Sequence, residues 1–181
     1  DHRAPSRLAP ASLPGGGRRV HTAGMPSIPM RVALGLSAVL AGAALFTAMA
    51  SEWWGGLVPC ALCLVGRWPY RAAIAFGVLG LVAPARLRWW AGLGVALSML
   101  ASVGVGVVHV GVEAKWWPSP LPGCVVRFTP GAALPERPAK PCDEPTYLIP
   151  ALPVSMAAMS LVFSLGLGGA MAALLRRRPI D

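Results

Sequence analysis

The run VALGLSAVLAGAALFTAMA, from Val32 to Ala50, decides the class of fold. It contains no charged residue, and it is close to the roughly 20 apolar residues that a helix needs to cross the 30 Å hydrocarbon core of a membrane. A run of this length and composition predicts a membrane-spanning helix rather than a helix of a soluble core.

Three further apolar stretches follow the first. Residues 89–112 carry no charge apart from a possible one on His109, and residues 147–175 are uncharged, with two early prolines that place the regular helix from about Val154. The remaining apolar stretch, residues 72–85, is too short to cross a membrane alone. It becomes long enough only if its helix starts near Leu57 and includes Arg67 and Arg71. We therefore expect an all-α membrane protein, a four-transmembrane-helix bundle over residues 30–176, with spans at about 32–50, 57–85, 89–112 and 154–175.

The composition favours the same class. Of the 181 residues, 55% are hydrophobic and 13% are charged, with a mean hydropathy of +0.60, whereas soluble domains carry about 25% charged residues. The 16 basic and 7 acidic residues give a net charge of +9, which taken alone fits a nucleic-acid-binding protein. The basic residues flank the apolar runs instead, which is the pattern of membrane proteins.

The arginines also predict which side of the membrane each segment faces. They cluster in the tail of residues 1–29, in the connection between the second and third spans, and at the C-terminal end around residues 177–181. By the positive-inside rule, these segments and both termini are cytoplasmic, so residues 51–59 and the long second loop, residues 113–146, face the periplasm of a bacterial inner membrane. The tail is rich in Pro, Gly and Arg, and we expect it to be disordered.

All four cysteines fall on the predicted outer side. Cys60 and Cys63 form a C-x-x-C at the mouth of the second span, and Cys124 and Cys142 lie in the long loop. Disulfides persist in an oxidising compartment, and one that closes the loop is a sufficient explanation for Cys124 and Cys142. A C-x-x-C closes almost no loop and is more often a redox motif. A zinc site made of the four thiols is the alternative, but the wide spacing in the loop and the oxidising compartment oppose it.

Two polar side chains add to the C-x-x-C. On a helix, Cys60, Cys63 and Arg67 lie at i, i+3 and i+7 on one face, so we expect the guanidinium to stabilise a thiolate on Cys63 and to donate to a bound ring; a snorkelling arginine is the alternative. His109 and Glu113 are spaced to pair, and His109 either moves a proton or has no task. A thiolate and a permanent positive charge in apolar surroundings at the membrane surface together indicate a binding site for a lipid-soluble two-electron acceptor, a quinone.

These residues resemble a known family. Pro59-Cys60-Ala61-Leu62-Cys63, followed by Arg67, Pro69 and Tyr70, is similar to the P-C-x-L-C-x-x-x-R-x-P-Y signature of the disulfide bond formation protein B (DsbB) family, which are thiol:quinone oxidoreductases. The similarity covers about residues 30 to 176 and continues through the end of the third span, the long loop and the entry to the last span, at His109–Glu113, Trp117-Pro118, Cys124, Pro141–Glu144 and Val154–Ala157.

The resemblance implies a role for each cysteine. Cys60 and Cys63 resemble the membrane-proximal redox pair of the family, and Cys124 and Cys142 resemble the loop pair that exchanges disulfides with a periplasmic thioredoxin-like oxidase, DsbA. The implied activity is that of an inner-membrane protein-dithiol:quinone oxidoreductase, which reoxidises a DsbA-like partner and supports disulfide bond formation. No metal is implied.

The resemblance also implies a quinone site. Arg67 resembles the arginine of that site and His109 a histidine near it, and the quinone is either ubiquinone or menaquinone. Gly66 stands where the family usually has Gln or Glu beside the arginine, and Tyr147 stands where a Trp is common. We therefore expect the packing near the quinone and at the entry to the last helix to differ from that of the family.

Two other interpretations remain at this point. Vitamin K epoxide reductase-like proteins use a four-helix membrane bundle, a C-x-x-C and loop cysteines for similar chemistry, but their C-x-x-C follows the loop pair, whereas here it comes first. A non-catalytic membrane assembly protein whose disulfides only staple its loops is the alternative from a different class.

Overall fold

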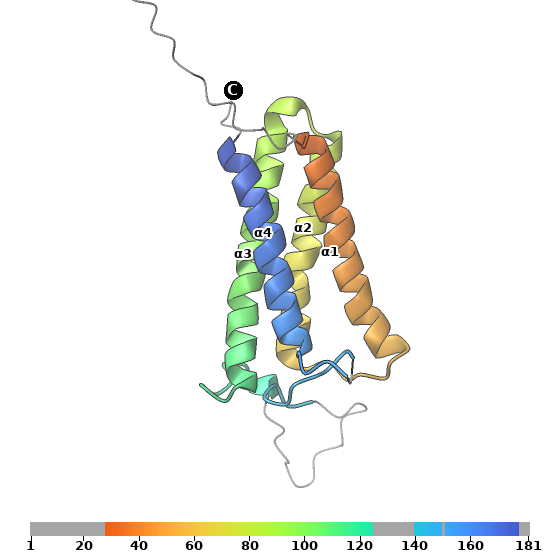
Figure 1. The fold of residues 1–181 in the computed structure, drawn as a ribbon, viewed down its shortest axis with the longest axis vertical. Helices are drawn as coiled ribbons and strands as arrows, with labels where there is room; N and C mark the ends of the chain where they lie inside the picture. Colours follow the sequence, from red (N-terminus) through yellow and green to blue (C-terminus); the bar gives the residue numbers. More distant parts are fainter. Residues whose placement is uncertain (1–27, 125–139, 150, 178–181) are drawn as a thin grey trace, which may run out of the picture.

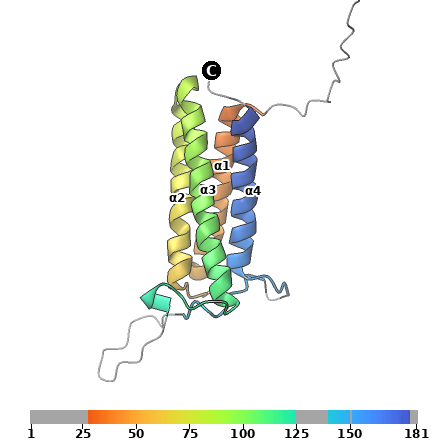
Figure 2. The same cartoon turned by 90° about the vertical axis from the view of Figure 1, so that its left-hand side faces the viewer.

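The computed structural model describes residues 28–124, 140–149 and 151–177. Within them the chain forms four long helices that run up and down side by side (Figures 1 and 2), namely α1 Met30–Trp53, α2 Ala61–Val82, α3 Ala85–Glu113 and α4 Met156–Arg177, with a short 3-10 helix, η1, at Pro122–Cys124. The expectation of an all-α, four-helix arrangement is confirmed for this part of the chain. The predicted disordered tail up to residue 27 and the basic end from residue 178 lie outside the described residues.

Three of the described helices, α1, α3 and α4, are long and apolar enough to cross a membrane. Helix α2 carries Arg67 and Arg71 and is less apolar. Apart from Arg71, its exposed surface is nevertheless largely apolar, because Trp68 and Val82 expose 66% and 80% of their surface. Exposed apolar surface of this extent does not occur on a water-soluble monomer, which fits an integral membrane protein.

Two helices begin later than the sequence predicts, because polar side chains cap them. Helix α2 starts at Ala61 rather than near Leu57, since Pro59 precedes the helix and the Cys60 sulfur accepts the backbone N–H of Cys63 at 3.2 Å. Helix α4 starts just after Ser155, whose hydroxyl oxygen accepts the backbone N–H of Ala158 at 3.2 Å. Side-chain acceptors of this kind satisfy the free N–H groups of a first turn.

Two other boundaries extend a helix into a predicted loop. Helix α1 continues to Trp53, so Glu52 lies in its last turn and not in the connection that follows. Pro84 is the N-cap of α3, so Arg86 and Arg88, which we expected in a loop, lie in its first turn. Proline is well suited to this position because it has no N–H that the helix must satisfy.

The helices pack through small residues and one continuous core. The core includes Leu34 from α1, Ala73 from α2, Met99 from α3 and Met171 from α4. Gly77 allows a close approach of α1 and α2, because a Cβ atom there would lie 2.9 Å from the carbonyl oxygen of Leu34. Small residues at such contacts are typical of helices that pack within a membrane.

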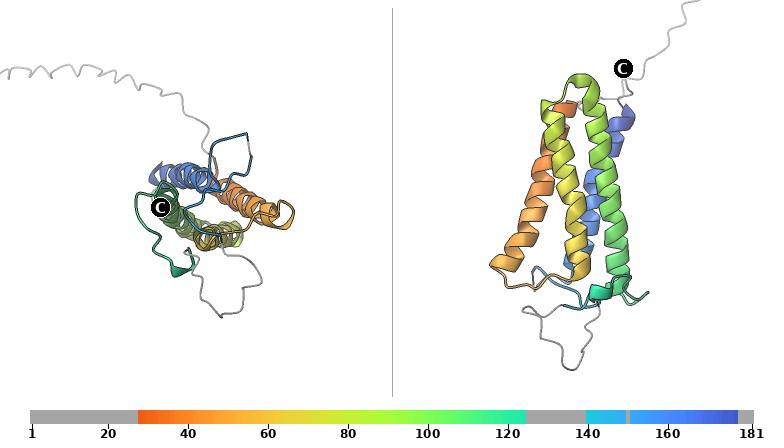
Figure 3. Two further views of the ribbon diagram at one scale, coloured as in Figure 1. Left: turned by 90° about the horizontal axis from the view of Figure 1, so that it is seen from below. Right: turned by 180° about the vertical axis from the view of Figure 1, so that it is seen from behind.

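The contacts between neighbouring helices are uneven. Helix α3 packs closely on α2 and α4, and α1 packs on α2, whereas α1 and α4 touch only slightly. Figures 1 and 3 show α1 leaning away from the bundle toward the end that carries the α1–α2 connection. The bundle is therefore loosest between α1 and α4.

The two ends of the bundle differ in chemistry. The turn between α2 and α3 and the C-terminal end of α4 lie at one end, and the connections after α1 and α3 lie at the other (Figures 1 and 3). The first end carries the arginines of the described helix termini, at Arg31, Arg86, Arg88, Arg176 and Arg177. The second end carries all four cysteines.

Candidate functional site

The C-x-x-C lies at the N-terminus of α2. Cys60 is the N-cap residue and Cys63 is in the first turn, with their sulfur atoms 2.7 Å apart. Pro59 and the capping contact fix the chain here, so both thiols stay beside the free N–H groups of the helix. The positive end of a helix dipole stabilises a thiolate, which makes this pair suitable for disulfide chemistry.

A buried histidine from α3 contacts this pair. The Nε2 atom of His109 lies 3.4 Å from the sulfur of Cys60 and 3.8 Å from Oε1 of Glu113, so the predicted pairing of His109 with Glu113 is confirmed. Glu113 also accepts a hydrogen bond from the Ser155 hydroxyl at 2.5 Å. The contact of His109 with Cys60 was not predicted, because it joins residues 49 positions apart in the sequence.

Arg67 forms an ion pair with Glu52, a partner that was not predicted from the sequence. Its Nη1 atom donates to Oε2 of Glu52 at 3.3 Å, and Nη2 pairs with Oε1 of the same carboxylate. Glu52 was assigned to a loop, and only the extension of α1 brings it opposite α2. We expected the guanidinium to stabilise a thiolate on Cys63; in the structure its ion pair is with Glu52.

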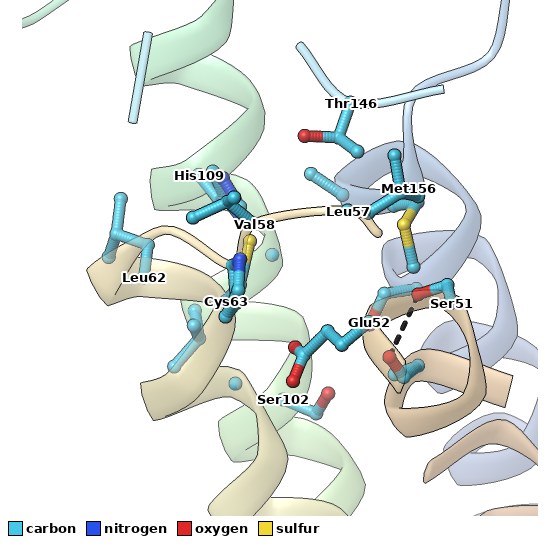
Figure 4. Close-up of a pocket in the computed structure, with 17 residues that line it drawn as sticks. Ser51, Glu52, Leu57, Val58, Leu62, Cys63, Ser102, His109, Thr146 and Met156 are labelled. Carbon is cyan, nitrogen blue, oxygen red and sulfur yellow. Dashed lines mark hydrogen bonds between the residues drawn. The ribbon is translucent and has the colours of Figure 1, made fainter. Parts of the chain in front are cut away.

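Two adjoining pockets lie beside these residues. The first is lined by Glu52, Cys63 and His109 together with apolar side chains and several hydroxyl groups (Figure 4). Figure 4 shows the Glu52 carboxylate extending from α1 into this space. The second is almost entirely apolar, lies between α1, α2 and α4, and includes Arg67 and Tyr70. Both pockets are lined by Ala48, Gly66, Met156 and Ser160.

A chain of hydroxyl groups connects α2, α4 and α3 along the wall of the pockets. The Tyr70 hydroxyl lies 2.8 Å from that of Ser160 and 3.0 Å from that of Ser164, and Ser102 lies 2.7 Å from Ser164. In a region without water, each hydroxyl needs such a partner. Tyr70 was noted only as part of a motif, and the serines were not singled out, because isolated serines in apolar runs give no signal in a single sequence.

The loop cysteines form a disulfide and pack against the C-x-x-C. Cys124 and Cys142 are joined with their Cα atoms 4.9 Å apart. Both are buried in one cluster with Cys60, Leu62 and Val112, and Cys63 packs against it. The fold therefore brings the two cysteine pairs together across 61 to 82 positions of sequence.

The same arrangement bears on the zinc alternative. The disulfide removes two of the four thiolates that a four-cysteine zinc site needs. Among the described residues, Cys60, Cys63 and His109 form the only group of three or more side chains whose ligand atoms lie within 4.8 Å of one another, and this group does not contain the loop cysteines.

Comparison with known proteins agrees with this geometry. No curated protein and no solved structure gives a significant match to the chain. The model of one protein family, described as disulfide bond formation protein DsbB, matches residues 30–174, which include all four helices up to the last turns of α4, both pockets and all four cysteines. The chain belongs to the DsbB family, and this membership implies an oxidoreductase activity in disulfide bond formation.

Proposed function

We propose that this protein is an inner-membrane protein-dithiol:quinone oxidoreductase. It reoxidises a periplasmic DsbA-like thiol oxidase by disulfide exchange and passes the electrons to a membrane quinone. The observation that carries this proposal is the packing of the Cys60–Cys63 pair with the buried Cys124–Cys142 disulfide, beside an apolar pocket that holds an arginine. A protein whose disulfides only staple its loops has no need for this proximity.

We assign α2 as the fourth membrane span and place the cysteine end of the bundle in the periplasm. The exposed apolar face of α2 supports this assignment, as does the pairing of Arg67 with Glu52, because a charge inside a membrane is tolerated mainly when it is paired. The arginines at the opposite end fit a cytoplasmic location of both termini.

The disulfide exchange starts at the loop. A thiolate of the reduced partner attacks Cys124, which breaks the Cys124–Cys142 bond and leaves Cys142 as a thiolate. The second thiol of the partner then resolves the mixed disulfide, so the partner leaves oxidised and both loop cysteines are reduced. Thiol exchange needs direct contact between sulfur atoms, and the shared cluster places Cys142 near Cys60 for the next step.

The second exchange moves the electrons to the C-x-x-C. The Cys142 thiolate attacks Cys60 of an oxidised Cys60–Cys63 pair, and Cys63 departs as a thiolate at the N-terminus of α2. Cys124 then displaces Cys60, which restores the loop disulfide and leaves the C-x-x-C reduced. Loss of two electrons and two protons returns Cys60 and Cys63 to a disulfide and completes the cycle.

The two pockets fit a quinone. A quinone supplies an acceptor for two electrons and two protons in lipid. The apolar pocket between α1, α2 and α4 suits an isoprenoid chain, and the slight contact of α1 with α4 leaves it a route from the membrane. Arg67 offers donors to a carbonyl oxygen, and Cys63 lies in the adjoining pocket. His109, oriented by Glu113, is placed to hold or move a proton at the sulfur of Cys60.

Anaerobic oxidation of a reduced DsbA-type protein by the purified protein tests this function. Ubiquinone and menaquinone are added in separate reactions, and partner thiols and quinol are counted together. We expect one quinol for each two partner thiols with at least one of the quinones. If neither quinone is reduced while the protein remains folded, the proposal is wrong, and a structural role for the disulfides or a different acceptor replaces it.

A further inference from the structure

The ion pair between α1 and α2 leaves one nitrogen of the guanidinium without a partner among the described residues. Glu52 takes both terminal nitrogens of Arg67, at Nη1 and Nη2. The Nε atom of Arg67 is buried and has no hydrogen-bond partner among the described residues. A buried donor without a partner is costly, and for a charged group more so. Because Arg67 lines the apolar pocket, a ligand oxygen that enters this pocket can supply an acceptor for the guanidinium.

The pair lies where the two pockets adjoin. Glu52 lines the pocket that contains Cys63 and His109, and Arg67 lines the apolar pocket. Between them Gly66 lines both pockets, and a Cβ atom at this position would be 3.8 Å from its nearest neighbour, in Val105. The space that a longer residue at position 66 would fill is open, and the carboxylate that reaches the arginine comes instead from the last turn of α1.

We propose that Glu52 is a positioning residue for Arg67 in quinone binding. By accepting from both terminal nitrogens, Glu52 fixes the plane of the guanidinium, whose remaining N–H groups are the donors to a quinone carbonyl oxygen. This inference rests on the function proposed above and adds to it a residue that orients the donor group. It follows from the fork geometry of arginine, which can bind a carboxylate with its two ends and still present a third donor.

Charge supports the same assignment. Glu52 and Arg67 expose only 19% and 13% of their side chains, so each is costly to bury alone. Paired, they present a neutral site to an uncharged quinone. Lysine at position 67 has one ammonium group in place of the planar fork, so it cannot hold the carboxylate in two places and keep a separate oriented donor.

Steady-state kinetics with a short-chain ubiquinone and a reduced DsbA-type partner test the inference. We expect Glu52→Gln and Arg67→Lys each to raise the quinone KM by about tenfold, which corresponds to about 1.4 kcal/mol, with kcat changed by less than about threefold. Glu52→Asp keeps the charge and should recover part of the loss. The double variant should be no worse than Arg67→Lys alone, because both changes remove one interaction.

Two matched controls separate this effect from general damage. Arg71→Lys alters the exposed arginine one turn further along α2, and Glu144→Gln alters an exposed carboxylate in the loop; both should keep the quinone KM within about twofold. KM does not depend on how much of a preparation is folded, so a less stable variant remains informative. An unchanged KM in Glu52→Gln overturns the inference while the proposed function stands. A wild-type protein that reduces no quinone overturns the proposed function itself.

Discussion

The two cysteine pairs are held in contrasting ways. Cys60 and Cys63 lie at the start of a long helix, where a backbone N–H of the first turn and His109 contact the sulfur of Cys60. Cys124 and Cys142 lie in the second loop, where η1 and the disulfide itself provide the local structure. Both pairs nevertheless share one buried cluster.

This contrast indicates a division of labour. A redox pair fixed on a helix can be aligned with neighbouring groups to within fractions of an ångström, whereas a loop can adapt to a soluble partner. On this account the helix pair serves the quinone and the loop pair serves the partner. The following variants test that division.

The largest effect is expected from Cys63→Ala. We expect quinone-dependent oxidation to fall by about 10³-fold or more, both for the protein partner and for the small dithiol dithiothreitol, because the C-x-x-C can no longer form its disulfide. Quinol formation followed by absorbance provides the measurement. Oxidation at the wild-type rate in this variant would remove Cys63 from the pathway.

The loop pair should have a narrower role. In Cys124→Ala/Cys142→Ala we expect oxidation of the protein partner to be lost, while oxidation of dithiothreitol by quinone continues within about tenfold of wild type. The small dithiol can reach Cys60 without the loop, since its size does not limit access. Equal loss of both activities would show that the two pairs do not divide the work.

His109 should affect the helix pair alone. His109→Ala is expected to slow quinol formation by about 10²-fold, the usual scale for a group that transfers a proton, with either dithiol as the donor. Exchange between the partner and the loop disulfide, followed by quenched thiol labelling, should keep its rate. Slower loop exchange would mean that the histidine acts mainly on the structure around both pairs.

The smallest effect is expected in the hydroxyl chain. Tyr70→Phe removes the contacts with Ser160 and Ser164, and interhelical hydrogen bonds in membranes are worth about 0.6 kcal/mol on average. We therefore expect a slightly lower melting temperature in detergent and little change in turnover. A large loss of turnover at unchanged stability would show that Tyr70 takes part in the chemistry.

Much of the fold was predictable because apolar runs report directly on membrane helices. The apolar run that starts at Val32 and the three apolar stretches that follow it predicted the number and order of the helices. The ends were less predictable, since capping by Cys60 and Ser155 depends on side-chain geometry. The extension of α1 to Trp53 was also missed, because the polar Ser51 and Glu52 follow the apolar run, and with it the position of Glu52 on a helix.

The candidate site was likewise predictable only in part. The cysteines, Arg67 and His109 were found from motif and spacing, and the structure brings the cysteines and His109 together. The partner of Arg67 could not be found in this way, because Glu52 is 15 residues away and on another helix. In the same way, Tyr70 meets Ser160 across 90 positions, which no local pattern encodes.

The central claim is that electrons pass directly between the two pairs, and one variant tests it most directly. In Cys63→Ala/Cys124→Ala, only Cys60 and Cys142 remain. After mild oxidation and digestion, we predict by mass spectrometry a disulfide that joins these two residues within one chain, at near-full yield. Two free thiols, or disulfides only between chains, would contradict the account.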